Sequence, residues 1–287
     1  MNRDLLHKFY KEYPIKTANV GKKTWEYIAC GIGKETLLLL PGGGQTAQGN
    51  FRLIQAFEKK YRIIVPTIYN VDTIEEFCFA INTILKKEKV KRIILYGLSI
   101  GGLMAQSYIK RNKEKVTTLI IFHACTPKSQ LYRRKIVPLL KLSFLLPFVP
   151  VGIFSSFLKH FAGKLQGAPK QKIDTSTKNE TQIISLTKLF TNEFFEKYLT
   201  KRLLTTWSNL HKDFIKESFS SQDFFDWKGK VLILRSDDDP LMQDEGDFKK
   251  VYPQASTYTF HHTGHLTYYY QFPQMVKVMQ NFFCLHI

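Results

Sequence analysis

Short runs of apolar residues recur along the chain, and segments of helical periodicity separate them. Residues 36–40, 61–65 and 116–122 are rich in apolar side chains, as is typical of strands buried on both faces of a sheet. Residues 73–88 instead carry apolar side chains at every third or fourth position, which predicts an amphipathic helix. This alternation predicts right-handed crossovers and a mostly parallel central sheet flanked by helices, with ligands at the carboxyl ends of the strands.

The same patterns predict the elements at both ends of the chain. Residues 3–12 are expected to form a helix, and residues 16–19 and 24–29 a hairpin at the antiparallel edge of the sheet. The other predicted elements are a helix over 49–60, strands over 231–235 and 257–260, and a closing helix over 273–284.

A sharp strand-to-helix turn carries the strongest chemical signal. The apolar strand 91–96 runs into Gly97-Leu98-Ser99-Ile100-Gly101, and the helical segment 103–109 follows without a break. This is the G-x-S-x-G nucleophile elbow, in which strain holds the serine hydroxyl exposed and the glycines allow close backbone approach. The unpaired N–H groups at the helix start stabilise negative charge on a substrate oxygen. Ser99 is therefore the candidate nucleophile of an acyl transfer.

A second glycine-rich segment, Pro41-Gly42-Gly43-Gly44, ends the strand over 36–40. It could be a flexible turn or a loop whose N–H joins that of Ile100 at a substrate oxyanion. We favour the oxyanion loop, because strand, glycine-rich loop and helix occur in the order that the elbow requires.

Between residues 126 and 225 the alternation of strand-like and helix-like segments stops, which predicts a helical cap inserted into the core. Residues 142–158 are uncharged but contain Pro147 and Pro150 and are shorter than the ~20 residues of a membrane span, so broken helices lining an acyl pocket are the better interpretation. Residues 164–182 are expected to form a mobile loop. The cations expected on the solvent side are Arg133, Arg134, Lys135, Lys141 and Lys159.

Composition narrows the class of protein. The chain has 287 residues, 44% of them hydrophobic, which fits one large α/β domain with an insertion. Its four cysteines lack metal-ligand spacing and its amino terminus has no apolar leader, so we expect free thiols and a cytoplasmic location. The net charge is +18, and residues 127–220 hold 16 Lys and Arg against 6 Asp and Glu. No nucleic-acid motif accompanies this charge, so we do not expect nucleic-acid binding.

With these motifs in order, the chain resembles the α/β-hydrolase superfamily of serine hydrolases. The resemblance implies a triad in the order Ser, Asp, His, formed by Ser99, Asp239 and His265. Asp239 stands three residues after the strand end at Ser236, and Asp238 is the alternative acid. The family spacing also implies that the oxyanion donors are the N–H groups of Gly43 and Ile100, with the neighbouring Gly44 as the alternative to Gly43.

The resemblance divides the chain into a core over 1–125 with the elbow, a cap over 126–225, and a core over 226–287 with the acid and histidine. It implies hydrolysis of a carboxylic ester or thioester through an acyl-enzyme on Ser99, without a cofactor or metal. Three histidines between 261 and 265 could suggest zinc, but no spaced partner accompanies them.

Two departures from the family pattern keep a second hypothesis open. Pro41 replaces a frequent oxyanion-loop histidine, and the D-x-x-G-x-G-x-S pattern is missing from residues 65–72. Residues 41–47, 76–78 and 101–106 are similar to maspardin-like members, a branch thought to include non-catalytic binding proteins. The alternative is therefore a scaffold that binds a protein or ligand. For the enzyme, the basic cap favours an acyl substrate presented by an anionic membrane surface or an acidic carrier protein.

Overall fold

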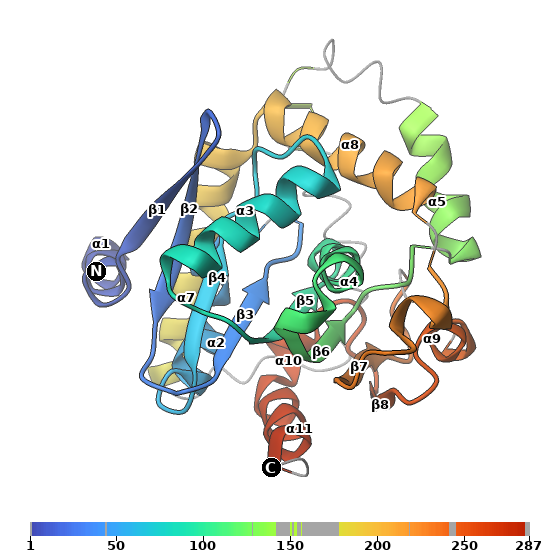
Figure 1. Ribbon diagram of the computed structural model, residues 1–287. Coiled ribbons are helices and arrows are strands. Elements are labelled where there is room, and N and C mark those ends of the chain that lie inside the picture. The colour runs from blue at the N-terminus through green and yellow to red at the C-terminus, as the bar shows by residue number, and fades with distance from the viewer. Residues whose placement is uncertain are drawn as a thin grey trace.

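One mixed sheet forms the centre of the molecule (Figure 1). The computed structural model describes residues 2–43, 45–127, 129–141, 150, 152–153, 156, 178–217, 219–240 and 245–284. Within these ranges eight strands pair in the order β1-β2-β4-β3-β5-β6-β7-β8. The strands are β1 (Ile15–Val20), β2 (Lys23–Cys30), β3 (Thr36–Leu40), β4 (Arg62–Pro66), β5 (Ile93–Leu98), β6 (Val116–Phe122), β7 (Lys230–Ser236) and β8 (Ser256–Phe260).

Strand direction follows the predicted pattern. β1 pairs with β2, and β2 with β4, in antiparallel register, whereas every pairing from β4 through β8 is parallel. All five residues of β3 and all six of β5 are buried, as expected of strands covered on both faces. The predicted mostly parallel sheet, with an antiparallel edge at the amino terminus, is confirmed.

Helices cover both faces of this sheet (Figure 1). One core lies between the sheet and side chains of α3, α4, α8 and α9, and the other between the sheet and side chains of α1, α2, α7 and α11. The helices are α1 (Asn2–Glu12), α2 (Phe51–Phe57), α3 (Ile74–Lys87), α4 (Ile100–Arg111), α5 (Gln130–Lys141), α7 (Lys178–Glu193), α8 (Lys201–Lys216), α9 (Glu245–Val251), α10 (Thr267–Tyr270) and α11 (Phe272–Cys284).

Most helix boundaries agree with the sequence pattern, and two differ. α3 begins where predicted, because the hydroxyl of Thr73 caps it by accepting from the backbone N–H of Glu76 at 3.0 Å. The helix expected over 49–60 starts as a 3₁₀ turn at Gln48 and ends at Phe57. There the backbone N–H groups of Lys60 and Tyr61 both donate to the Phe57 carbonyl, and the chain turns into β4. The prediction of a loop over 164–182 is wrong at its carboxyl end, because α7 already begins at Lys178.

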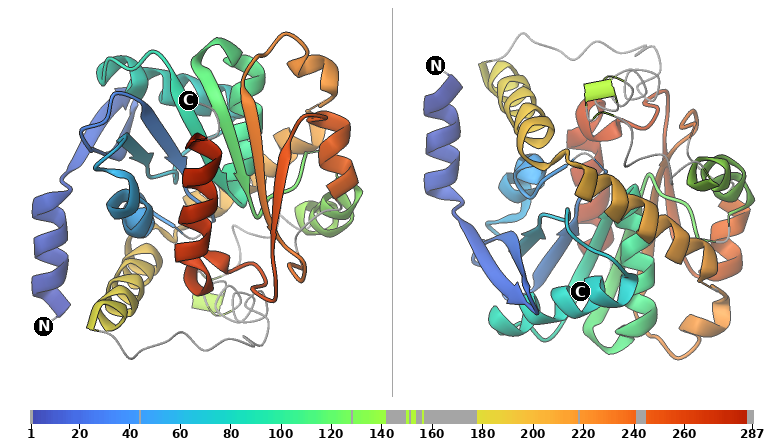
Figure 2. Two further views of the ribbon diagram at one scale, coloured as in Figure 1. Left: turned by 90° about the horizontal axis from the view of Figure 1, so that it is seen from below. Right: turned by 90° about the horizontal axis from the view of Figure 1, so that it is seen from above.

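The described part of the segment 126–225 is mostly helical and packs on the core through both apolar and polar contacts. α7 packs beside α1, where the hydroxyl of Tyr10 donates to Glu193 at 2.5 Å. A π-helical turn, Phe194–Tyr198, joins α7 to α8, and α8 crosses the molecule toward α5 (Figure 2, right). Most of the uncharged stretch 142–158 lies outside the described residues. Among those described, no helix is long and apolar enough to cross a membrane.

Candidate active site

Four neighbouring strands end in the loops that carry the candidate residues. Ser99 follows β5, His123 follows β6, Asp239 follows β7 and His265 follows β8. Because these strands are parallel and adjacent in the sheet, their carboxyl ends meet at one edge. Backbone bonds from Ser99 to Phe122 and from His123 to Leu234, at 2.9 and 3.0 Å, hold neighbouring loops in line.

Ser99 has the backbone strain expected of an elbow. Its φ of 53° and ψ of −119° lie outside the regions that a residue with a side chain normally adopts. The surrounding glycines make the turn possible, since a Cβ on Gly97 would lie 2.3 Å from the carbonyl oxygen of Gly101 and one on Gly101 2.4 Å from that of Leu40. α4 starts at Ile100, so the Ile100 N–H has no carbonyl of its own helix to bond.

The glycine-rich loop lies beside the elbow. A Cβ on Gly43 would lie 3.8 Å from the Cγ2 atom of Ile100, which places the two predicted oxyanion donors on adjacent backbone segments. The backbone N–H of Gly42 donates to Oε1 of Gln45 at 3.4 Å, and the N–H of Gln45 donates to the Gly42 carbonyl at 3.2 Å. Gly44, the alternative donor, lies outside the described residues.

Three consecutive aspartates after β7 have three different partners. Oδ2 of Asp239 lies 2.8 Å from Nδ1 of His265. Asp238 instead accepts from the Ser236 hydroxyl at 2.7 Å and from the Gly264 N–H at 2.8 Å. Asp237 lies on the surface and pairs with His261 at 2.7 Å. Asp239 is thus the aspartate that contacts the predicted histidine, and its side chain is fully buried.

A second histidine contacts the same carboxylate oxygen, and the sequence analysis missed it. Nδ1 of His123 lies 2.6 Å from Oδ2 of Asp239, and its Nε2 lies 2.7 Å from the hydroxyl of Thr267. The His123 side chain has no exposed surface and its φ is 47°, in the left-handed region. A polar residue directly after a buried strand beside the elbow strand was the only signal for it in the sequence.

The two histidines determine the charge state of the acid. Burial alone would raise the pKa of Asp239, but hydrogen bonds from His123 and His265 outweigh it and hold the pKa well below its usual value. Burial lowers the pKa of His123, which favours the neutral ring. Since an ionised carboxylate only accepts, Nδ1 of each histidine carries the hydrogen toward Asp239. Nε2 of His265 is then left for a proton from elsewhere.

Ser99 and His265 are both described, and the structure contains no hydrogen bond between them. Such a bond is often long in a hydrolase without substrate and tightens when substrate binds. The structure therefore brings together Asp239 and His265 of the predicted triad, with Ser99 on the elbow at the same edge of the sheet.

Two carboxylate–histidine groups are compact enough to consider as metal sites. One consists of His123, Asp239 and His265, and the other of Asp237, Asp238 and His262, with ligand atoms within 4.8 Å of one another. In the first group the two nitrogen–oxygen distances, 2.6 and 2.8 Å, are those of hydrogen bonds. Of the histidines between 261 and 265, His261 pairs with Asp237 and His265 with Asp239, so these two rings face different carboxylates.

A small apolar space adjoins the oxyanion loop and Ile100. Its volume is about 10 Å³. Trp207 of α8 reaches the loop itself, since its Cζ2 atom would lie 3.9 Å from a Cβ on Gly43. Trp207 also stacks on Phe194 with ring planes 14° apart. The residues that line the space are Pro41, Gly42, Gln45, Ile68, Ile100, Met104, Phe194, Trp207 and Leu210.

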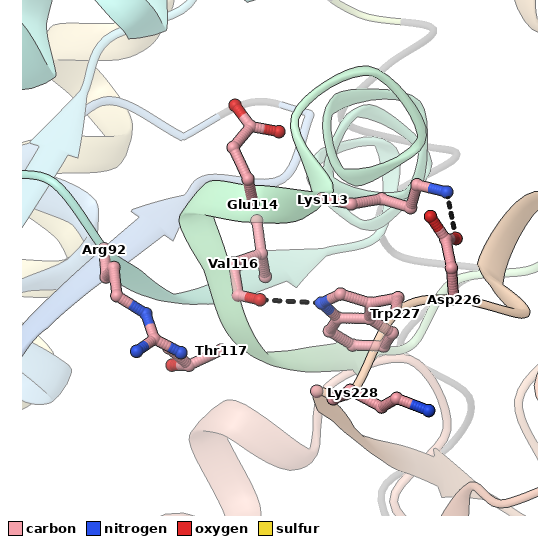
Figure 3. Close-up of a pocket in the computed structure, with 9 residues that line it drawn as sticks. Arg92, Lys113, Glu114, Val116, Thr117, Asp226, Trp227 and Lys228 are labelled. Atoms are coloured by element: carbon pink, nitrogen blue, oxygen red, sulfur yellow. Dashed lines mark hydrogen bonds and ion pairs between the residues drawn. The ribbon is translucent and has the colours of Figure 1, made fainter.

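A larger cavity of about 420 Å³ lies at the opposite end of the sheet (Figure 3). It is lined by residues at the amino ends of β5, β6 and β7, among them Arg92, Val116 and Gly229. There the indole N–H of Trp227 donates to the Val116 carbonyl at 2.7 Å. The candidate residues follow the carboxyl ends of the same strands, so this cavity is not part of the site.

Known proteins share this fold. A family model described as the alpha/beta hydrolase fold matches residues 35–271. The match spans β3 through α10 and so includes all four loops of the site. The chain therefore belongs to the α/β-hydrolase family. A search of curated protein sequences found no match.

Solved structures of bacterial proteins share the fold across nearly the whole chain. Cfl2 from Burkholderia cenocepacia matches with a TM-score of 0.72 and 15% identity over 95% of this chain and 96% of that one. Carboxylesterase CesB (YbfK) from Bacillus subtilis matches with a TM-score of 0.66 and 14% identity over 100% and 98%. A thermophilic esterase from Thermogutta terrifontis matches with a TM-score of 0.66 and 14% identity over 94% and 97%. At such identities the likeness is one of fold.

Proposed function

We propose that the protein is a serine hydrolase that cleaves a carboxylic ester or thioester through an acyl-enzyme on Ser99. The observation that carries the proposal is the hydrogen bond from His265 to the buried carboxylate of Asp239, at the same edge of the sheet as an elbow serine with strained backbone. Esterases among the structural neighbours support hydrolysis of esters in general.

In the proposed reaction, Oγ of Ser99 attacks the acyl carbon and its proton passes to Nε2 of His265. Asp239 keeps the imidazole oriented and stabilises its positive charge. The N–H groups of Ile100 and Gly43 donate to the oxyanion. Collapse of the intermediate breaks the acyl bond, and His265 protonates the departing alcohol or thiol. A water molecule then gives its proton to His265 and attacks the acyl-enzyme, which releases the acid and restores Ser99.

The substrate class follows from the surroundings of the site. Apolar side chains of α4 and the 194–210 segment line the space beside the oxyanion loop, which favours an apolar acyl group. The basic excess of residues 127–220 favours presentation of this acyl group by an anionic membrane surface or an acidic carrier protein. Arg133 is not free for that purpose, because it is half-buried and donates to the Ile215 carbonyl at 2.9 Å. Arg134, one residue on, is exposed.

Covalent labelling tests the nucleophile. A fluorophosphonate probe should label the folded wild type, and Ser99→Ala should abolish labelling because the attacking oxygen is lost. Ser107→Ala serves as the matched control, since Ser107 is a buried serine of α4 whose hydroxyl donates to Glu217. Equal labelling of wild type and Ser99→Ala would refute the assignment. A folded wild type that is never labelled would favour the non-catalytic scaffold.

A further inference from the structure

The carboxylate of Asp239 needs more than one contact to be held in place. The last torsion of an aspartate side chain is soft, so each hydrogen bond to Oδ2 narrows the range of orientations that the carboxylate can adopt. The second donor, Nδ1 of His123, reaches the same oxygen at 2.6 Å from the next strand. Two donors from different loops thus hold Oδ2 of the carboxylate in place.

His123 is itself held on several sides. Its ring packs on that of Phe122 with centroids 4.4 Å apart, and Nε2 lies 2.7 Å from Oγ1 of Thr267. Neutral His123 with hydrogen on Nδ1 accepts at Nε2, so the Thr267 hydroxyl donates to it. A left-handed φ of 47° is less costly for histidine than for most residues, but it still requires such contacts to persist.

These contacts link His265 back to its own chain segment through Asp239, His123 and Thr267. Thr267 stands two residues after His265, so the path from His265 through Asp239 and His123 returns to the loop where it began. Oγ1 of Thr263 lies 2.5 Å from that of Thr267 and 2.9 Å from the Ser236 hydroxyl, which ties the same loop to the end of β7.

We infer that His123 is a positioning residue, which orients the triad through its bond to the carboxylate of Asp239. This inference rests on the proposed function. His123 does not contact the reacting atoms; it sets the angle at which Asp239 holds His265. The ionisable groups that face His123 are Asp239 and Asp238 from the loop after β7 and His265 from the loop after β8.

Two amide variants separate this role from simple packing. Asparagine places its amide nitrogen at the position of Nδ1 and accepts a left-handed backbone, so His123→Asn keeps the donor to Asp239. Glutamine places its amide at the position of Nε2, so His123→Gln keeps the contact to Thr267 and loses the one to Asp239. The two variants are equally polar and differ by one methylene.

We expect His123→Gln to lower kcat by about 10–100-fold with KM within about twofold, the range for one lost bond to a charged group. His123→Asn should stay within about threefold of the wild type. A merely structural role would change KM and kcat together, whereas a positioning role lowers kcat in His123→Gln and leaves KM unchanged.

The measurement is kcat and KM on a soluble p-nitrophenyl ester, together with fluorophosphonate labelling of each folded variant. Equal activity of His123→Gln and wild type would overturn the inference, and so would a His123→Asn variant that is more impaired than His123→Gln. In either case, labelling of Ser99 by the probe would still support the proposed function. A wild type that is folded but unlabelled would overturn the proposed function and this inference with it.

Discussion

At the scale of single residues, chain neighbours in this site have separate tasks. Asp237, Asp238 and Asp239 are consecutive, yet one pairs at the surface, one anchors the loop before His265, and one bonds two histidines. A turn directs successive side chains apart, so adjacent carboxylates need not share a role.

The first prediction separates two of these aspartates. Asp239→Asn should lower kcat by up to ~10⁴, because an amide in that position no longer enforces the required tautomer of His265. Asp238→Asn, the matched control, should lower kcat far less, since the amide oxygen still accepts from Ser236 and Gly264. Steady-state kinetics on one ester checks both. The reverse ranking would assign the triad acid to Asp238.

A second residue-scale prediction concerns Trp207. Its ring approaches the oxyanion loop and helps to confine a space of about 10 Å³. Trp207→Ala should increase kcat/KM for an octanoyl ester by about tenfold relative to kcat/KM for an acetyl ester, because removal of the ring leaves room for further methylenes.

Trp207→Phe, which keeps most of the ring, should change the acyl-chain preference by much less. A series of p-nitrophenyl esters from acetyl to dodecanoyl measures it. An unchanged preference in Trp207→Ala would show that the acyl group lies elsewhere.

Residues with local signals could be predicted from the sequence, and residues defined by distant partners could not. Ser99 stands inside a five-residue pattern, and His265 follows a glycine after the last strand. His123 has no pattern, because its partners Asp239 and Thr267 lie 116 and 144 residues further along the chain. Only the folded sheet brings the ends of β6, β7 and β8 together.

At the scale of elements, apolar runs predicted the strands better than periodicity predicted the helix ends. β3, β5 and β6 are buried and continuous, so their composition is enough to identify them. α2 ends at Phe57 because the chain must turn into β4, a tertiary constraint with no local signal. The short α9 and α10 were not predicted at all, since neither presents enough turns for a periodic pattern.

The third prediction concerns the contact between α5 and α8. Tyr132 of α5 bonds Nδ1 of His211 on α8, and burial lowers the pKa of His211 to about 4. The folded state therefore binds fewer protons than the unfolded state between pH 6.5 and 4. Stability should fall as the pH drops through this window, by about 2 kcal/mol for a ring that keeps some solvent contact.

In His211→Asn the side-chain oxygen takes the position of Nδ1 and still accepts from Tyr132, but it does not titrate. Urea unfolding at pH 7, 5.5 and 4.5 should show a smaller loss of stability for the variant than for the wild type. An equal loss of stability in the two proteins would show that His211 is not the group whose protonation destabilises the folded state.

At the scale of the whole molecule, the charge of +18 acts over distances longer than any single contact. The fourth prediction is that turnover on anionic vesicles decreases as salt shortens the Debye length from ~30 Å at 0.01 M to ~8 Å at 0.15 M. Arg134, Lys188 and Lys212 are exposed cations on α5, α7 and α8. Replacing all three with Gln should remove much of the salt dependence.

The matched control replaces Lys59, Lys60 and Lys91 with Gln. These residues are exposed before β4 and β5, at the other end of the sheet, and carry the same total charge. The control should hydrolyse vesicle-bound substrate at the same rate as the wild type. On a soluble neutral ester, the wild type and both triple variants should have the same rate. Equal salt dependence in both triple variants would mean that net charge, and not the basic cap, attracts the vesicle.

The position of the insertion within the sheet has a consequence for evolution. The chain leaves the core after β6 and re-enters it at β7, and these strands are adjacent, paired from Thr118 with Lys230 to Phe122 with Leu234. Because β6 and β7 are parallel, the insertion begins at the carboxyl end of β6 and returns to the amino end of β7, and the sheet fixes the positions of both ends, whatever lies between them. Doubling the length of a loop with fixed ends costs only ~0.6 kcal/mol. Descendants of this chain can therefore exchange one insertion for another, and acquire new substrates, while inheriting the same reaction chemistry.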